Sequence, residues 1–127
     1  KGIPKDSEVF ITEEGAEKYL RDGQDDFAEK CLSEAVELCP SDYESLEDRA
    51  GLLFKKKRLD DALKDLDRVL ELSVNSHYSH YLKGKILMTK RDFAGALTEF
   101  NEAIKITDSK PEYYEKRGNC QFELGRY

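Results

Sequence analysis

The chain has 127 residues, which is enough for one domain of ordinary size. Hydrophobic residues make up 39% of it and support a packed core, while the 38% of charged residues indicates helices with heavily solvated faces. The net charge of −6 argues against a nucleic-acid-binding module, which needs a basic surface, and no apolar run is long enough for membrane insertion.

Cysteines and histidines are too few and too badly spaced for a metal centre or a disulfide framework. Cys31, Cys39 and Cys120 are odd in number and show no C-x-x-C spacing, so we expect small apolar thiols in a reducing compartment inside the cell, the cytoplasm by preference. His77 and His80 share a helix face without a third ligand nearby, and packing explains His80 better. No cofactor, metal site or catalytic residue is predicted, and the segment is not expected to be an enzyme.

Apolar residues recur at intervals of three and four, which predicts helices along nearly the whole chain. In chain order, we expect helix pairs at about 8–39, 42–73 and 76–107, followed by a single helix at about 110–124. Capping boxes that start at Ser41 and Ser109 are predicted to open two of these helices. Pro111 suits the first turn of the last helix, where its missing N–H costs little.

A period of 34 residues aligns small residues with small ones and large residues with large ones. The small columns contain Ala16, Ala50, Gly84 and Gly118, then Ala28, Ala62 and Ala96; a bulky column contains Leu32, Leu66 and Phe100. Two antiparallel helices approach closely only where side chains are small, and one pair cannot bury its apolar faces alone. We therefore expect helical hairpins that stack on one another.

This period and pattern resemble the tetratricopeptide repeat family over residues 9–127. The resemblance implies an all-α fold, a right-handed superhelical solenoid of antiparallel helix pairs. The expected division is a tail at 1–8, then repeat units at 9–42, 43–76 and 77–110. Residues 111–127 are then the first helix of a truncated fourth unit or a capping helix.

The resemblance also implies a concave groove lined by the first helix of each unit. The corresponding residues are Phe10, Glu13, Glu17, Glu44, Glu47, Gly51, Phe54, Tyr78, Tyr81, Lys85, Met88, Glu112, Glu115 and Asn119. They form an acidic trough with a tyrosine platform, which suits a partner segment with Lys or Arg beside an aromatic or aliphatic anchor. The alternative is an ordinary solvated helix face.

The best-known activity of this family is the binding of chaperone tails that end in Glu-Glu-Val-Asp, and this chain lacks the residues for it. That carboxylate clamp needs Lys, Arg and Asn at set positions. Here those positions hold Glu13, Glu17, Asp48, Tyr78 and Leu82, and a frame shifted by one unit supplies the right charge only at Lys116. Carboxylates would repel the incoming carboxylate, so we reject the clamp.

A second candidate surface is the edge that carries the turns within each helix pair. Its cations are Lys55, Lys56, Lys57, Arg58, Lys90 and Arg91. They are either solvated turns or a docking site for an acidic partner or an anionic filament. A nuclear-import signal is a weaker interpretation.

The sequence thus predicts a protein-interaction module of a scaffold or adaptor that binds a protein or peptide partner, without nucleic-acid binding or membrane insertion. Two alternatives stay open. One is a structural component of a large cytoskeletal or ciliary assembly that makes contacts through its edges. The other is a targeting arm of a co-chaperone, without a carboxylate clamp. The oligomeric state is left open.

Overall fold

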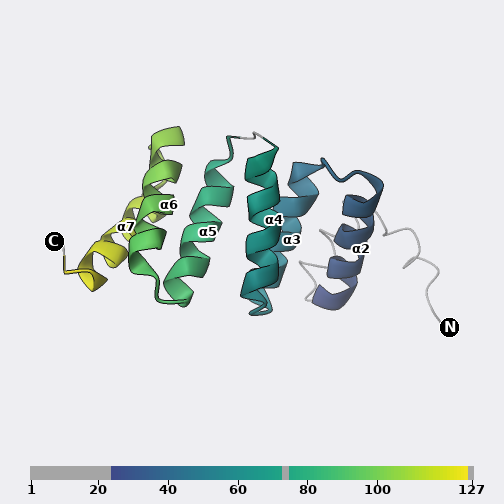
Figure 1. The fold of residues 1–127 in the computed structure, drawn as a ribbon, viewed down its shortest axis with the longest axis horizontal. Coiled ribbons are helices and arrows are strands. Elements are labelled where there is room, and N and C mark those ends of the chain that lie inside the picture. Colours follow the sequence, from purple (N-terminus) through teal and green to yellow (C-terminus); the bar gives the residue numbers. More distant parts are fainter. Residues whose placement is uncertain (1–23, 73–74, 126–127) are drawn as a thin grey trace. The chain divides into compact units, whose positions relative to one another are not determined.

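The computed structural model describes residues 24–72 and 75–125, and every regular element in these ranges is an α-helix (Figure 1). The helices are α2 (Asp25–Leu38), α3 (Tyr43–Lys55), α4 (Leu59–Glu71), α5 (His77–Thr89), α6 (Phe93–Ile106) and α7 (Pro111–Glu123). Across the described residues, no helix combines the length and apolar character that a membrane span needs. The prediction of an all-α chain of helix pairs is confirmed for this part of the sequence.

The chain divides into two compact units, residues 1–68 and 69–127. In the first unit, α2 packs on α3. Ala28, Cys31 and Leu32 on α2 form a buried cluster with Leu52 of α3, and Phe27 packs against it. Ala28 is fully buried, as expected for a small residue where two helices touch.

In the second unit, α6 packs on both α5 and α7, and consecutive helices run in opposite directions (Figure 1). Ala96 and Phe100 of α6 and Cys120 of α7 are fully buried together. Partly buried residues surround this cluster: Tyr81, Leu87, Met88, Phe93 and Leu97. Ala28, Gly84 and Ala96 from the small columns therefore lie at helix contacts, as predicted.

Side-chain caps at the helix starts repeat with the 34-residue period. Asp42 caps α3 by accepting a hydrogen bond from the Ser45 amide, and Ser76 caps α5 by accepting one from the Ser79 amide. Both predicted capping boxes were wrong. Asp42, one residue after Ser41, takes the cap, and α7 starts after Lys110 without a side-chain cap.

The turns within the helix pairs use a left-handed residue at the same repeat position. Lys57 and Arg91 both have φ of 66°, and Gly125 has φ of 74°. The amides that follow reach back to close each helix: Arg58 N–H donates to the Leu53 carbonyl, and Asp92 N–H donates to the Leu87 carbonyl, both at 2.8 Å. Two non-glycine residues therefore occupy a conformation that favours glycine.

All three cysteines are free thiols, but they are not all apolar core residues. Cys31 and Cys120 are buried, as predicted, whereas Cys39 is exposed at the C-terminal cap of α2. The expectation for Cys39 was wrong because the helix ends one residue before it and turns it outward. Its thiol lies 3.8 Å from the Ser41 hydroxyl.

Candidate protein-interaction site

The second unit carries a fixed tyrosine platform between α5 and α7. The ring of Tyr81 stacks on the ring of Tyr113, with centroids 4.4 Å apart and planes at 27°. The buried ring of Phe100 also contacts Tyr81, with the two ring centroids 5.8 Å apart. Because Tyr81 is held by core residues, its partly exposed ring presents a surface of defined orientation.

Both histidines take part in the packing of this unit. His77 Nδ1 lies 2.7 Å from the hydroxyl of Tyr113, and the two rings tilt against each other. His80 Nδ1 lies 2.8 Å from a carboxylate oxygen of Glu99 on α6. Each imidazole thus contacts a different residue, His77 on Tyr113 and His80 on Glu99, and His80 helps to hold α5 against α6.

Two carboxylates on α7 lie close to the platform. Burial raises the pKa of the Tyr81 hydroxyl, and the negative charges of Glu112 and Glu115 raise it further. Glu112, Glu115 and Tyr81 all belong to the second unit, and their assignment to one groove stays a prediction.

A cation also lies against the tyrosine platform. The Lys85 ammonium lies 5.0 Å from the centroid of the Tyr81 ring. Burial lowers the pKa of Lys85, and the positive charge of Lys116 lowers it further. Positive charge from Lys85 and Lys116 therefore accompanies the negative charge of Glu112 and Glu115 around Tyr81 and Lys85.

The remaining predicted groove residues fall into three groups. In the second unit, Tyr78 and Asn119 are exposed, while Met88 packs against the core cluster. In the first unit, α3 carries the exposed Glu44 and the half-buried Glu47, Gly51 and Phe54. Phe10, Glu13 and Glu17 lie outside the described residues. A groove that continues across both units stays a prediction.

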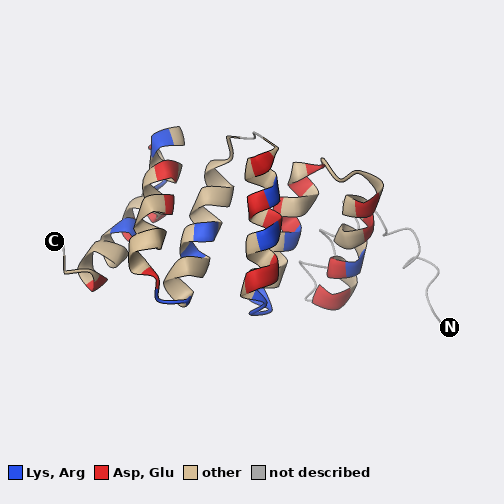
Figure 2. Ribbon diagram, in the orientation of Figure 1, with Lys and Arg blue, Asp and Glu red and all other residues tan. Residues whose placement is uncertain are grey.

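Most cations of the basic edge in the first unit form ion pairs with carboxylates of the same unit. Lys56 Nζ lies 2.6 Å from Asp26 and 2.7 Å from Glu29, both on α2, and its hydrogen bonds lower the pKa of each carboxyl. Lys55 pairs with Asp25 at 3.4 Å. Figure 2 shows the blue turn between α3 and α4 at the same end of the unit as the red start of α2.

Three other cations of the predicted edge are exposed at turns. Lys57 and Arg91 hold the left-handed turn positions, and the Arg91 guanidinium lies 5.2 Å from the centroid of the Phe93 ring. Lys90 is also exposed. In the first unit, Lys55, Lys56 and Arg58 are therefore paired within the chain, whereas Lys57 and Arg91 hold turn positions in their respective units.

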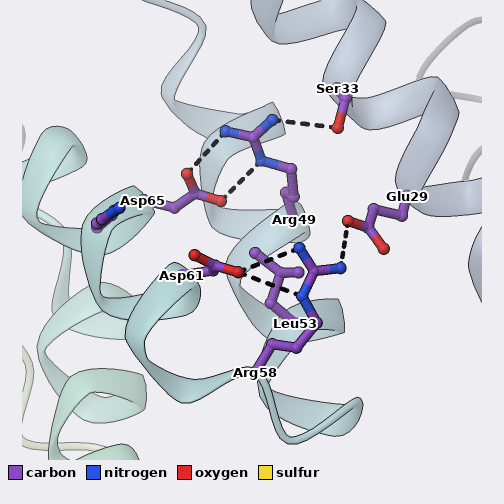
Figure 3. Close-up of a pocket in the computed structure, with 8 residues that line it drawn as sticks. Glu29, Ser33, Arg49, Leu53, Arg58, Asp61 and Asp65 are labelled. Atoms are coloured by element: carbon purple, nitrogen blue, oxygen red, sulfur yellow. Dashed lines mark hydrogen bonds and ion pairs between the residues drawn. The ribbon is translucent and has the colours of Figure 1, made fainter.

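A pocket of about 260 Å³ on the first unit was not foreseen from the sequence (Figure 3). Its lining residues are Glu29, Ser33, Arg49, Leu53, Arg58, Asp61, Lys64 and Asp65. Arg49 binds Asp65 through two hydrogen bonds of 2.8 Å, and Arg58 bridges Glu29 and Asp61 at 2.7 and 3.1 Å. These pairs tie α2, α3 and α4 together, which is a structural role for the pocket side chains.

Comparison with known proteins places the sequence among helical repeats. The profile of the tetratricopeptide repeat family matches residues 15–76 and 60–111. A tetratricopeptide repeat and J domain-containing co-chaperone, DNJ1 of Cryptococcus neoformans, is 30% identical over 87% of this chain. Hsp70-Hsp90 organizing protein 3 of Arabidopsis thaliana is 24% identical over 91% of it. The chain spans about a fifth of the length of each, 21% in both cases.

Solved structures share the fold at low sequence identity. The first tetratricopeptide domain of Spaghetti (RPAP3), bound to the HSP90 peptide SRMEEVD, superposes with a TM-score of 0.86 at 17% identity. It covers 94% of this chain, which covers 93% of that domain. A crystal structure of MamA gives a TM-score of 0.81 at 19% identity over 87% of this chain and 65% of that one. The fold expected from the 34-residue period is thereby confirmed.

Proposed function

Because the chain belongs to the tetratricopeptide repeat family, we propose that it is a non-catalytic protein-interaction module that binds a partner segment on the α5–α7 face of its second unit. The segment carries Lys or Arg beside an aromatic or aliphatic anchor. This extends the family's general role in protein interaction to a particular surface and a particular ligand chemistry.

The observation that carries this proposal is the Tyr81 platform with two carboxylates acting on it. The stacked ring of Tyr81 offers apolar contact area at little entropic cost, since packing already fixes its orientation. Glu112 and Glu115 supply negative charge for the basic residue of the partner. Lys85, whose ammonium lies over the Tyr81 ring, and Lys116 oppose a second basic residue in the partner segment.

The same charges argue that this chain does not bind an acidic chaperone tail. The HSP90 peptide in the RPAP3 structure, SRMEEVD, ends in an acidic stretch. Glu112 and Glu115 would meet that stretch with like charge. The proposed ligand is therefore opposite in charge to the peptide bound by that structural neighbour.

Peptide titration by isothermal calorimetry tests the proposal. The probes are short peptides with one Arg next to one Phe or Leu, and SRMEEVD serves as the contrasting peptide. We expect binding of the Arg peptides, weakened at least about tenfold by the double change Glu112→Gln and Glu115→Gln, because a charge-assisted contact contributes about 1.4 kcal/mol or more. SRMEEVD should bind more weakly than the Arg peptides.

A matched variant is Glu102→Gln, which removes a carboxylate from α6 that pairs with Lys105 on the surface. It removes one negative charge at an i,i+3 pair within α6, and we expect it to leave the affinity unaltered. Equal affinity of the Arg peptides for the parent chain and the Glu112/Glu115 double variant would rule the proposed site out.

A second candidate role is a co-chaperone arm, which the names of two relatives favour. One relative is a co-chaperone with a J domain, and the other is an Hsp70-Hsp90 organizing protein. In this role, the same face would hold a basic-aromatic segment of a client or chaperone. A docking site for an acidic partner at the basic edge is disfavoured in the first unit, because Lys55, Lys56 and Arg58 are paired within the chain.

A further inference from the structure

The pocket of the first unit is formed by one face of each of three helices (Figure 3). On every helix the lining side chains are three or four positions apart: Glu29 and Ser33 of α2, Arg49 and Leu53 of α3, and Asp61, Lys64 and Asp65 of α4. The side chains of Arg49 and Asp65 are only 22% and 8% exposed, and Leu53 is buried. Lys64 is exposed. The pocket thus has an ion pair and an apolar wall inside and a cation at its mouth.

The pocket is on the opposite side of α3 from the residues predicted to line the groove. At about 100° per residue, Arg49 lies about 160° around the helix from Glu47 and from Gly51. Leu53 is one turn from Arg49 and shares its side. The pocket is therefore distinct from the groove in which the family resemblance would place an acidic chaperone tail.

The charges that line the pocket leave one cation over. All three carboxylates are paired within the unit: Asp65 with Arg49, Asp61 with Arg58, and Glu29 with Arg58 and Lys56. Lys64 forms no hydrogen bond or ion pair with any described residue. Its positive charge is therefore the uncompensated one in the lining, which favours a ligand with a single negative charge.

Arg49 and Ser33 add hydrogen-bond donors beside this cation. A guanidinium has five N–H donors, and Arg49 uses three of them, two on Asp65 and one on the Ser33 hydroxyl oxygen. Two N–H donors of Arg49 remain, and the hydroxyl hydrogen of Ser33 is a further donor. A carboxylate accepts several such bonds at once through its two oxygens, so it matches this set of donors.

The size of the pocket indicates what carries the carboxylate. Its volume of about 260 Å³ is below the about 300–1,000 Å³ of pockets that enclose a whole small molecule. One side chain that projects from a partner protein fits this space, as anchor residues do at interfaces. The buried Leu53 offers an apolar wall for the methylene groups of such a side chain.

The cation at the mouth is not needed for helix packing, because the second unit lacks it. The ion pair within the helix pair recurs there, since Lys83 of α5 lies 3.8 Å from Glu99 of α6. The residue that corresponds to Lys64, 34 positions later, is Thr98. Lys64 is thus a feature of the first unit and not of the repeat.

We propose that this pocket binds an acidic side chain of a partner protein, a glutamate whose carboxylate contacts Lys64, Arg49 and Ser33 and whose methylene groups lie on Leu53. Arg58 keeps its pairs with the neighbouring carboxylates and shapes the wall of the pocket, so the basic edge itself is not the docking site. The inference concerns the first unit and does not rest on the proposed function, which concerns the second.

The test is a titration of the ¹⁵N-labelled chain of residues 1–127 with the capped peptide Ala-Ala-Glu-Ala-Ala. We expect saturable amide shifts at Ser33, Arg49 and Lys64. The same peptide with Gln in place of Glu should bind at least about fivefold more weakly, because an uncharged amide loses the charge-assisted hydrogen bonds. The Glu112/Glu115 double variant should bind the Glu peptide like the parent chain, which separates this site from the α5–α7 face.

Variants at the mouth identify the cation. Lys64→Gln should weaken binding of the Glu peptide at least about fivefold, and its exposed position keeps the fold intact. The matched control is Lys57→Gln, which removes an exposed cation from a turn of the same unit and should leave the affinity unaltered. Ser33→Ala should weaken binding by a smaller factor, since it removes one neutral donor.

Three results would overturn the inference. The first is the absence of saturable shifts in the pocket up to about 50 mM peptide, a concentration that detects even a single weak contact. The second is equal binding of the Glu and Gln peptides, or of the Glu peptide to the parent chain and to Lys64→Gln. The third is inorganic phosphate that shifts the same amides at lower concentration than the Glu peptide, which would assign the pocket to a free anion.

Discussion

The ring of Phe100 lies directly over the backbone of Gly84. A Cβ at position 84 would lie 2.6 Å from Cε1 of this ring and 2.9 Å from both Cδ1 and Cζ. The ring is fully buried, so it has little room to move away. Contact between α5 and α6 in the second unit therefore depends on the absence of a side chain at residue 84.

We predict that Gly84→Ala destabilises the chain by about 1–3 kcal/mol, because the strain of overpacking exceeds the gain in helix propensity. Gly118→Ala, at the same position of the next first helix, is the control. Nothing lies within 4 Å of its added Cβ, so it should stabilise by up to about 1 kcal/mol. Urea unfolding measures both, and equal effects of the two changes would contradict the packing described.

Replacing Lys57 by glycine should raise the free energy of unfolding by about 1 kcal/mol. Lys57 has φ of 66°, where an L-residue with a Cβ is strained and glycine is not. The control is Lys30→Gly at an exposed position inside α2, which should lower stability by about 1 kcal/mol. If Lys57→Gly destabilised as much as Lys30→Gly, the turn conformation assigned to Lys57 would be wrong.

Within the described residues, periodicity alone was enough to predict the helices and most of the residues at their contacts. Ala28, Ala62 and Ala96 are fully buried as expected, because only small side chains let two helix backbones approach closely. The helix caps were harder to predict, because Ser41 and Asp42 are adjacent and both are good cap residues. Only the backbone geometry decides between them.

The charged surface could not be predicted from local sequence. The run from Lys55 to Arg58 is basic as written, but its partners Asp25, Asp26 and Glu29 lie about 30 residues earlier and meet it only after folding. The predicted groove residues did not include Lys116, whose positive charge lowers the pKa of Lys85. Pairing across helices, which composition does not show, decides which charges face a partner.

Arg49→Met should destabilise the chain by about 3 kcal/mol, because it leaves the carboxylate of Asp65 nearly buried without its guanidinium partner. The double change Arg49→Met and Asp65→Leu should recover most of that loss, since no buried charge then remains. Chemical denaturation of the two single variants and the double variant gives the coupling energy. Strictly additive losses would show that the pair contributes nothing.

Acid should weaken the first unit partly through Lys56. Its hydrogen bond lowers the pKa of Glu29 from the ordinary value of 4.5 and also lowers that of Asp26. A carboxyl whose pKa is lower in the folded chain than in the unfolded chain stabilises the fold at pH values above its unfolded-state pKa. This contribution disappears as the pH falls through the folded-state pKa. The affected range is therefore below pH 4.5.

The expected result is that Lys56→Met loses less stability than the parent chain between about pH 7 and about pH 3. Lys30→Met removes an exposed cation from α2 and serves as the control, with a pH dependence like that of the parent. Urea unfolding at the two pH values gives the difference. A Lys56→Met variant with the parent's full acid sensitivity would exclude these ion pairs as its source.

The most direct test of the binding face is amide chemical-shift mapping of the ¹⁵N-labelled chain during titration with an Arg–Phe peptide. We predict that the shifted resonances cluster at Tyr81 on α5 and at Glu112 and Glu115 on α7, and that the Tyr81→Ala chain loses them. Shifts confined to the turn at Lys55–Arg58, or a peptide that leaves α5 and α7 unperturbed, would contradict the assignment of partner binding to the α5–α7 face.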